Sequence, residues 1–214
     1  KGLCMPVTSC RSFWLGSVAL AATLATPAAF ADYLWLERGA GQPAKAYLSN
    51  FQPSERLALS TLIQVEALLG EGKRVPLAAS GDGFPIAQSV AGDLRVSAKQ
   101  TEPGKLTLYE AKEGRSETKA RNDLELVPTT ANGNTFKLYW KGGVVSASQV
   151  NVYTSRQWNR TIKPAADGSV TLDTPFPGQY VLEVVAQVNG AVTVQGQKFD
   201  TVVHVATLSF NVPG

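Results

Sequence analysis

The most regular alternation of apolar and polar positions lies on either side of a proline-glycine corner within residues 165–184. Apolar residues take every second position there, at Val170 and Leu172 and again at Tyr180, Leu182 and Val184. This period of two is typical of strands with one buried face. Asp167-Gly168 before the first strand and residues 175–178 between the two are turn sequences. The segment therefore predicts two strands of a small β-sandwich.

The same alternation continues through residues 122–214. Further short runs of this kind occur at residues 123–127, 136–140, 150–153, 158–162 and 202–212. About seven short strands, with a turn roughly every ten residues, fit an immunoglobulin-like or transthyretin-like β-sandwich. We expect a mainly β protein with this sandwich as its C-terminal domain.

Residues 32–121 are less regular, and we expect a smaller β-rich N-terminal domain there. Strand-like runs occur at residues 33–36, 44–48, 94–98 and 106–109. In residues 54–70, an N-cap at Ser54 and a stop at Gly70 favour one short helix, although a strand also fits the apolar positions. Residues 112–122 are highly charged and predict a solvated loop or linker. The sequence is compatible with two arrangements of residues 32–121: an independent domain, or an extension of the sheet of the C-terminal sandwich.

Residues 1–31 have the pattern of a signal peptide, with a charged start, an apolar run and the small-residue cleavage sequence Ala29-Phe30-Ala31. The mature chain is then expected to begin at Asp32. The apolar run is shorter than the roughly 20 residues that a membrane span needs. We therefore expect an exported protein of a bacterial cell envelope, periplasmic or secreted, that is not membrane-embedded after cleavage.

Charge and cysteine content narrow the choice of partners. The whole chain has a net charge of +3, which falls to +1 without Lys1 and Arg11. This balance does not support binding to nucleic acid or to anionic membranes. Cys4 and Cys10 both precede residue 32, so a mature chain would use neither disulfides nor thiolate metal sites.

His204 is the single histidine of the chain, and it alternates with apolar residues of the last strand. A histidine of the core or its rim is one interpretation, a metal ligand is the second, and a catalytic base is the third. No nucleophile elbow and no metalloprotease helix accompanies it. We therefore expect a protein that is not an enzyme.

Two carboxylates complete the candidate site. Glu183 shares a strand face with two valines, so its carboxylate is either paired or at an exposed edge. Arg156 or Arg160 is the possible ion-pair partner, and a metal site beside His204 is the functional alternative. Asp32, at the expected mature start, is the second acidic candidate. Trp158, which has polar neighbours, is the aromatic residue best suited to an exposed binding surface, whereas Trp35 and Trp140 are expected in the core.

The sequence resembles the NikM-like periplasmic family at three places. Residues 32–37, Asp-Tyr-Leu-Trp-Leu-Glu, resemble that family's mature start, residues 198–210 its closing strand, and residues 165–184 the transthyretin-like motif between them. The resemblance implies a role in nickel or cobalt uptake. His204 and Glu183 match positions that recur in the family, whereas Asp32-Tyr33 stands where the family has a histidine.

Two functions follow as hypotheses. The first is a non-enzymatic accessory or binding protein in transition-metal uptake, with His204, Glu183 and Asp32 as ligands of a nickel or cobalt ion and a membrane transporter or outer-membrane receptor as partner. The second is a structural or interaction module, which presents a strand edge or the Trp158–Arg160 surface to an envelope protein and holds no metal. The first predicts that the three ligand residues converge in space.

Overall fold

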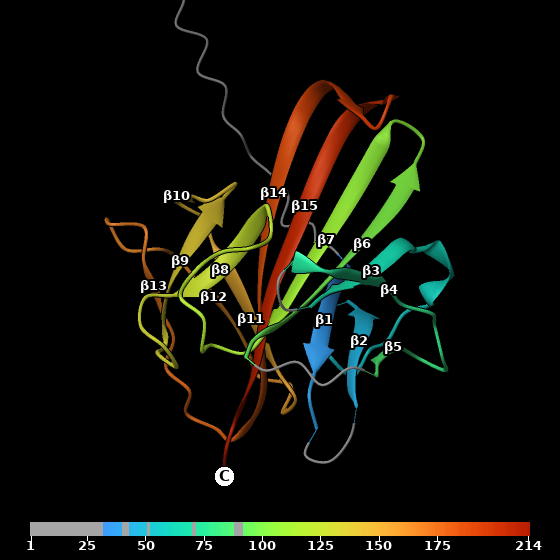
Figure 1. The fold of residues 1–214 in the computed structure, drawn as a ribbon. Helices are drawn as coiled ribbons and strands as arrows, with labels where there is room; N and C mark the ends of the chain where they lie inside the picture. The colour runs from blue at the N-terminus through green and yellow to red at the C-terminus, as the bar shows by residue number, and fades with distance from the viewer. Residues whose placement is uncertain (1–31, 40–42, 51, 70–71, 88–91) are drawn as a thin grey trace, which may run out of the picture.

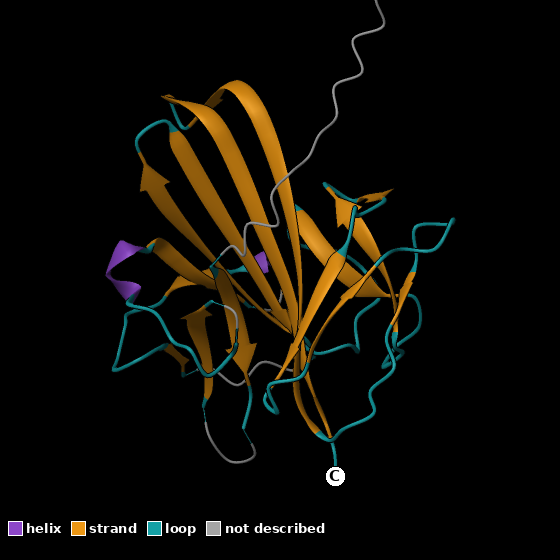
Figure 2. Ribbon diagram, turned by 180° about the vertical axis from the view of Figure 1, so that it is seen from behind, coloured by secondary structure: helices purple, strands orange, loops and turns teal. Residues whose placement is uncertain are grey.

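A computed structural model describes residues 32–39, 43–50, 52–69, 72–87 and 92–214 of the chain. The predicted signal peptide lies outside the described residues. Nearly every regular element is a β-strand (Figures 1 and 2), so the expected mainly β fold is confirmed. None of the described helices is long and apolar enough to cross a membrane.

An eight-stranded sheet forms the centre of the molecule, with the strand order β12-β11-β14-β15-β7-β6-β3-β4. These strands span, in the same order, Asn159–Ile162, Val150–Thr154, Gly178–Val194, Gln197–Val212, Lys105–Glu113, Leu94–Glu102, Ile63–Leu68 and Arg74–Pro76. β15 and β7 are parallel, and the other neighbours are antiparallel. β14 and β15 form the longest hairpin and rise beside β7 and β6 (Figure 1).

Two small sheets flank the base of the large one (Figure 1). β8, β9, β10 and β13 form a four-stranded sheet and span Leu124–Pro128, Thr135–Trp140, Gly143–Val145 and Val170–Thr171. β1, β2 and β5 form a three-stranded sheet and span Tyr33–Glu37, Ala44–Ser49 and Phe84–Ile86.

Between Val203 and Phe210, the alternation of β15 separates the two larger of three hydrophobic clusters, whereas Phe199 and Val202 join Leu106 in the third. Its even-numbered residues, such as Leu208 and Phe210, pack against the four-stranded sheet on what we call face A. Its odd-numbered residues, such as Val203 and Val205, pack on face B against the core of the three-stranded sheet. The period of two read from the sequence therefore decides which of these two larger cores a side chain of residues 203–210 enters.

The helix expected within residues 54–70 is wrong. That segment forms a single 3₁₀ turn at Leu59–Thr61 (η1) and then strand β3. Val65 and Ala67 are buried at alternate positions, and a bulge near Gln64, which has a φ of 49°, restores the pairing with β6. Burial of a strand face against the large sheet thus outweighs the local helix signals.

The large sheet is continuous across residue 121. Residues 105–113 of β7 pair with residues 201–209 of β15, so strands from both sides of the predicted boundary between residues 32–121 and 122–214 share one sheet. The immunoglobulin-like or transthyretin-like topology of residues 122–214 stays a prediction.

Candidate functional site

His204 lies on face A and is 5 % exposed. Its Nδ1 is 3.0 Å from Oε2 of Glu110 on β7, and its ring stands edge-on to Trp140 with 4.6 Å between the ring centroids. Glu110 also accepts the backbone N–H groups of Asp123 and Leu124. The carboxylate thereby joins β7, β15 and the start of β8, which fits a buried histidine with a satisfied hydrogen bond.

Glu183 lies on face B, on the other side of the sheet. It pairs with Thr207 in the strand register, whereas His204 pairs with Ala186. Because 204 and 207 differ by an odd number, their side chains point to opposite faces. The sheet itself therefore separates the predicted imidazole and carboxylate ligands.

The hydrogen-bond partners of Glu183 are neutral. Tyr153 Oη donates to its Oε2 over 2.9 Å, and Asn151 Nδ2 donates over 3.2 Å. Arg156 and Arg160, the predicted ion-pair partners, are not among its contacts in the described chain. Burial raises the pKa of Glu183, and the hydrogen bonds from Tyr153 and Asn151 offset only part of this effect.

Tyr33 completes this cluster from β1. Its ring stacks on that of Tyr153 with 5.0 Å between centroids. Among the described residues, Tyr33 Oη and Glu183 Oε1 are buried without a hydrogen-bond partner. Burial raises the pKa of both tyrosines, and the nearby Glu183 raises it further. Burial in this cluster therefore disfavours the charged forms of Glu183, Tyr33 and Tyr153.

Asp32 is partly buried just before β1. Burial raises its pKa, while the charge of Lys105 lowers it. No three histidine, cysteine, aspartate or glutamate side chains of the described residues gather so as to hold a metal ion. The predicted ligand set of His204, Glu183 and Asp32 is therefore not assembled by this fold.

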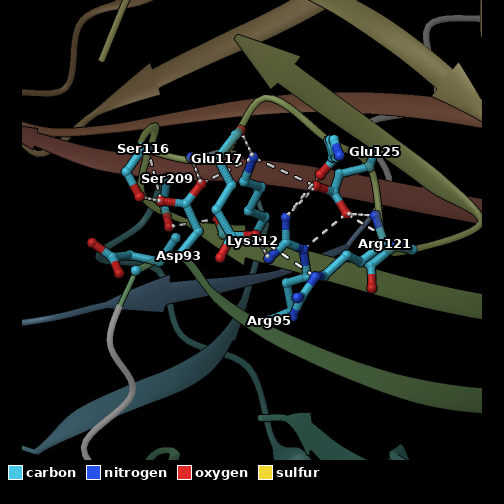
Figure 3. Close-up of polar contacts among 12 residues, drawn as sticks. Asp93, Arg95, Lys112, Ser116, Glu117, Arg121, Glu125 and Ser209 are labelled. Carbon is cyan, nitrogen blue, oxygen red and sulfur yellow. Dashed lines mark hydrogen bonds and ion pairs between the residues drawn. The ribbon is translucent and has the colours of Figure 1, made fainter. Parts of the chain in front are cut away.

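A buried charge cluster lies where residues 114–123 cross face A (Figure 3). Its core is Arg95 on β6, Lys112 on β7 and Glu125 on β8, each no more than 1 % exposed. Arg95 donates from Nε and Nη2 to the two carboxylate oxygens of Glu125, over 3.0 and 2.8 Å. Lys112 Nζ lies 3.4 Å from Glu125 and 3.1 Å from Asp93.

The crossing segment supplies the remaining partners of this cluster. Glu117 accepts from Arg95 Nη1 over 2.8 Å, and the N–H groups of Ser116 and Glu117 donate to Asp93. Burial alone would raise the pKa of Asp93, but these hydrogen bonds and the charge of Lys112 leave it lowered. Residues 114–123 form the expected loop, whereas Lys112 and Glu113 belong to β7. The loop is not only solvated, because Glu117 and two of its backbone N–H groups complete the buried charge cluster.

Trp158 lines a surface hollow of about 640 Å³ together with Arg156, Gln157 and Phe176. Its ring meets that of Phe176 at 70°, with 6.2 Å between centroids. Trp158 itself is half-buried, and Phe176 is the more exposed of the two rings. Trp35 is buried as expected, and Trp140 packs against the face A core.

The outer strands of the sheets differ in how their edges are protected. β4 carries Arg74 and Pro76, and β12 carries Arg160, so both ends of the large sheet hold the charge or proline that discourages pairing with another chain. The edge of β1 is covered by β15, because Thr207 and Ser209 donate to the carbonyls of Leu34 and Leu36, each over 2.6 Å.

No charge, proline or paired strand of the described chain protects the outer edge of β14 over residues 184–194, and residues 146–148 line a hollow beside its start at Val184–Ala186. β11 pairs with β14 only as far as Glu183, and no other described strand pairs with this edge beyond that point. The stretch contains no charged residue and no proline, and Val185 and Val188 are 38 % and 40 % exposed. It is an open strand edge suited to pairing.

Comparison of the chain with protein-family models, with curated proteins and with solved structures gives no match. The resemblance to the NikM-like family therefore stays a prediction.

Proposed function

We propose that the protein is an exported, non-enzymatic interaction module of the bacterial cell envelope. It acts by offering the open edge of β14 to another polypeptide strand. The observation that supports this is the contrast between edges of one sheet: β4 and β12 carry charge or proline, whereas residues 184–194 carry neither. Backbone N–H and C=O groups along such an edge bind an extended segment by adding it to the sheet.

The test is site-specific cross-linking in the producing bacterium. A photoreactive amino acid replaces Val188 on the open edge, and in a matched variant it replaces Thr161 on the protected strand β12. Irradiation is expected to give a discrete adduct from position 188 and none from position 161. An edge that gives no adduct in the cell envelope would contradict the proposed function, and the mass of any adduct identifies the partner.

The proposal also includes the location of the protein in the cell and the class of its partner. Cell fractionation is expected to find the protein outside the inner membrane, with a mass that corresponds to a start at Asp32. A membrane transporter or an outer-membrane receptor is the class of partner that the sequence resemblance implies. Detection of the full-length chain in the cytoplasm alone would count against an envelope role.

The geometry gives less support to a role in nickel or cobalt uptake. His204 with Glu110 is a carboxylate–imidazole pair of the kind that orients metal-ligating histidines. The other two predicted ligands, Glu183 and Asp32, do not join it. A metal ion at His204 would therefore lack the two carboxylate ligands that the hypothesis requires.

A further inference from the structure

The straight part of the open edge of β14 has a defined length. It begins after Glu183, where the pairing with β11 ends, and it continues to Asn189, where a bulge interrupts the pairing with β15. Beyond the bulge the hairpin bends over β7 toward β6 (Figure 1), and Lys99 Nζ is 3.3 Å from Gln195 Oε1. A partner strand therefore has residues 184–189 to pair with before the edge leaves the sheet.

This stretch is complementary to itself. An antiparallel pair related by a twofold axis presents the same donors and acceptors from both strands. Residues 184–189, Val-Val-Ala-Gln-Val-Asn, bear no charge, so two copies meet without the repulsion that β4 or β12 would cause with their arginines. A second copy thus satisfies both the hydrogen-bonding and the charge requirements of the edge.

The register of such a pair follows from the limits of the stretch. Residues opposite one another in an antiparallel pair lie on the same face, so the twofold axis falls on a residue and not between two. Centred on Ala186, the pairing brings Asn189 opposite Glu183, whose outer side β11 already occupies. Centred on Gln187, it sets Val185 opposite Asn189 and Ala186 opposite Val188, within the open stretch.

We propose that the open edge of β14 pairs with the same edge of a second copy of this chain, across a twofold axis at Gln187. This inference rests on the proposed function, since it names a second copy, in place of a transporter or receptor, as the partner of the same edge. The pairing places Val188 of one copy beside Ala186 of the other, on face A. A hollow of about 150 Å³, lined by Ala186, Trp140 and Val145 among others, adjoins that position and has room for a valine side chain.

Disulfide cross-linking tests the register directly. In a background with Cys4→Ser and Cys10→Ser, Gln187→Cys brings two sulfurs together across the axis, where paired Cα atoms lie about 4.5–5.5 Å apart. Val185→Cys is the matched control on the same strand, because its two copies lie about 13 Å apart along the strand. Under mild oxidation, Gln187→Cys is expected to form covalent dimer at least about tenfold faster than Val185→Cys.

Sedimentation equilibrium of the full chain tests the association itself. The protein is expected to dimerise, and Gln187→Lys is expected to weaken the dimer at least about tenfold, because like charges face each other across the axis. Thr161→Lys adds the same charge to β12 and is expected to leave the dimer unchanged. Both positions are exposed, and circular dichroism confirms that the variants fold.

Two results would overturn the inference. A protein that sediments as a monomer up to about millimolar concentration has no such interface. A dimer that Gln187→Lys leaves intact, or in which Val185→Cys cross-links as fast as Gln187→Cys, uses another surface or register. If the cellular adduct at Val188 contains a different protein, the inference of a second copy fails while the proposed function stands.

Discussion

Glu183 has an unusual position, because it is buried beside Tyr153 with one oxygen unpartnered among the described residues. Its raised pKa means that the folded protein holds a proton which the unfolded chain releases at lower pH. The free energy of unfolding therefore falls as the pH rises from the ordinary glutamate pKa, about 4.5, through the raised folded value.

Replacement of Glu183 by glutamine removes this cost, because the amide has no charge to desolvate and can still accept from Tyr153. We expect Glu183→Gln to unfold at a higher urea concentration than the wild type at pH 8, by about 1 kcal/mol in stability. At pH 4 the two proteins should be nearly equal. Urea titrations at both pH values measure the difference, with Glu66→Gln at a partly exposed carboxylate as control. A gap of the same size at both pH values would refute the explanation.

His204 allows a direct test of the metal hypothesis. Since His204 faces one side of the sheet and Glu183 the other, we expect calorimetric titration with Ni²⁺ or Co²⁺ to show no binding tighter than about millimolar. Tighter binding that His204→Ala abolishes would reinstate the metal role. Tighter binding that survives His204→Ala would place the ligands elsewhere in the chain.

The sequence predicts the faces of individual residues better than their partners. The period of two correctly separates Val202, His204 and Ala206 from their odd-numbered neighbours on β15. It contains nothing about Glu110, which lies on a strand far away in sequence and becomes the partner of His204 through the parallel pairing of β7 with β15. A single sequence specifies local periodicity, whereas such contacts depend on the strand order of the sheet.

Among the elements, residues 114–123 show most clearly how charge patterning can mislead. Their charged composition resembles that of a solvated linker, yet Glu117 and the N–H groups of this loop complete the shells of Arg95 and Asp93. The available signal is Arg95, which stands between Leu94 and Val96 in a predicted strand. A buried cation in a strand requires an anion nearby, and the next charged segment supplies one.

Loss of Glu125 tests how strongly this cluster holds the crossing loop. Burial alone would raise the pKa of Glu125, but the hydrogen bonds and charge of Arg95 and the charge of Lys112 hold it below its ordinary value. Glu125→Gln leaves two buried cations undercompensated, and we expect it to lower the free energy of unfolding at pH 7 by about 3–5 kcal/mol. Glu66→Gln, at an exposed pair with Arg74, should change it by less than about 1 kcal/mol.

The effect of Glu125→Gln should depend on pH with a definite sign. Because the folded pKa of Glu125 is lowered, its contribution is fully present above the unfolded value of about 4.5 and is lost as the pH falls through the folded value. The gap between wild type and variant in urea titrations should therefore narrow in acid. A gap that widens below pH 4 would contradict this assignment.

At the scale of the whole molecule, the large sheet joins both halves of the chain. A fragment of residues 122–214 lacks β7 and the three-stranded sheet, so the face B side of β15 loses its cover. Each newly exposed valine, such as Val203 or Val205, costs about 1.5–3 kcal/mol. We expect this fragment to lack a cooperative thermal transition, whereas a sharp transition near that of the whole chain would show that it folds alone.

The sequence could not predict this continuity, because the parallel pairing of β7 with β15 leaves no local signal. The strands themselves are visible as alternating runs, and their number near the C-terminus is close to that observed. Their assignment to one shared sheet depends on contacts between residues about a hundred positions apart. The regular alternation of residues 122–214 thus suggested a separate domain, whereas its sheet continues into β7.

The packing of β1 against β15 also sets the order in which the chain can fold. The hydrogen bonds from Thr207 and Ser209 to β1 each join residues 173 positions apart, so β1, which comes first among the described strands, must wait for β15, which comes last. Contacts of such long range slow folding, because the intervening chain must be ordered before they form. The core of face B can therefore close only after the chain has been synthesised as far as Ser209, so the apolar side of β1 has no cover from β15 until then.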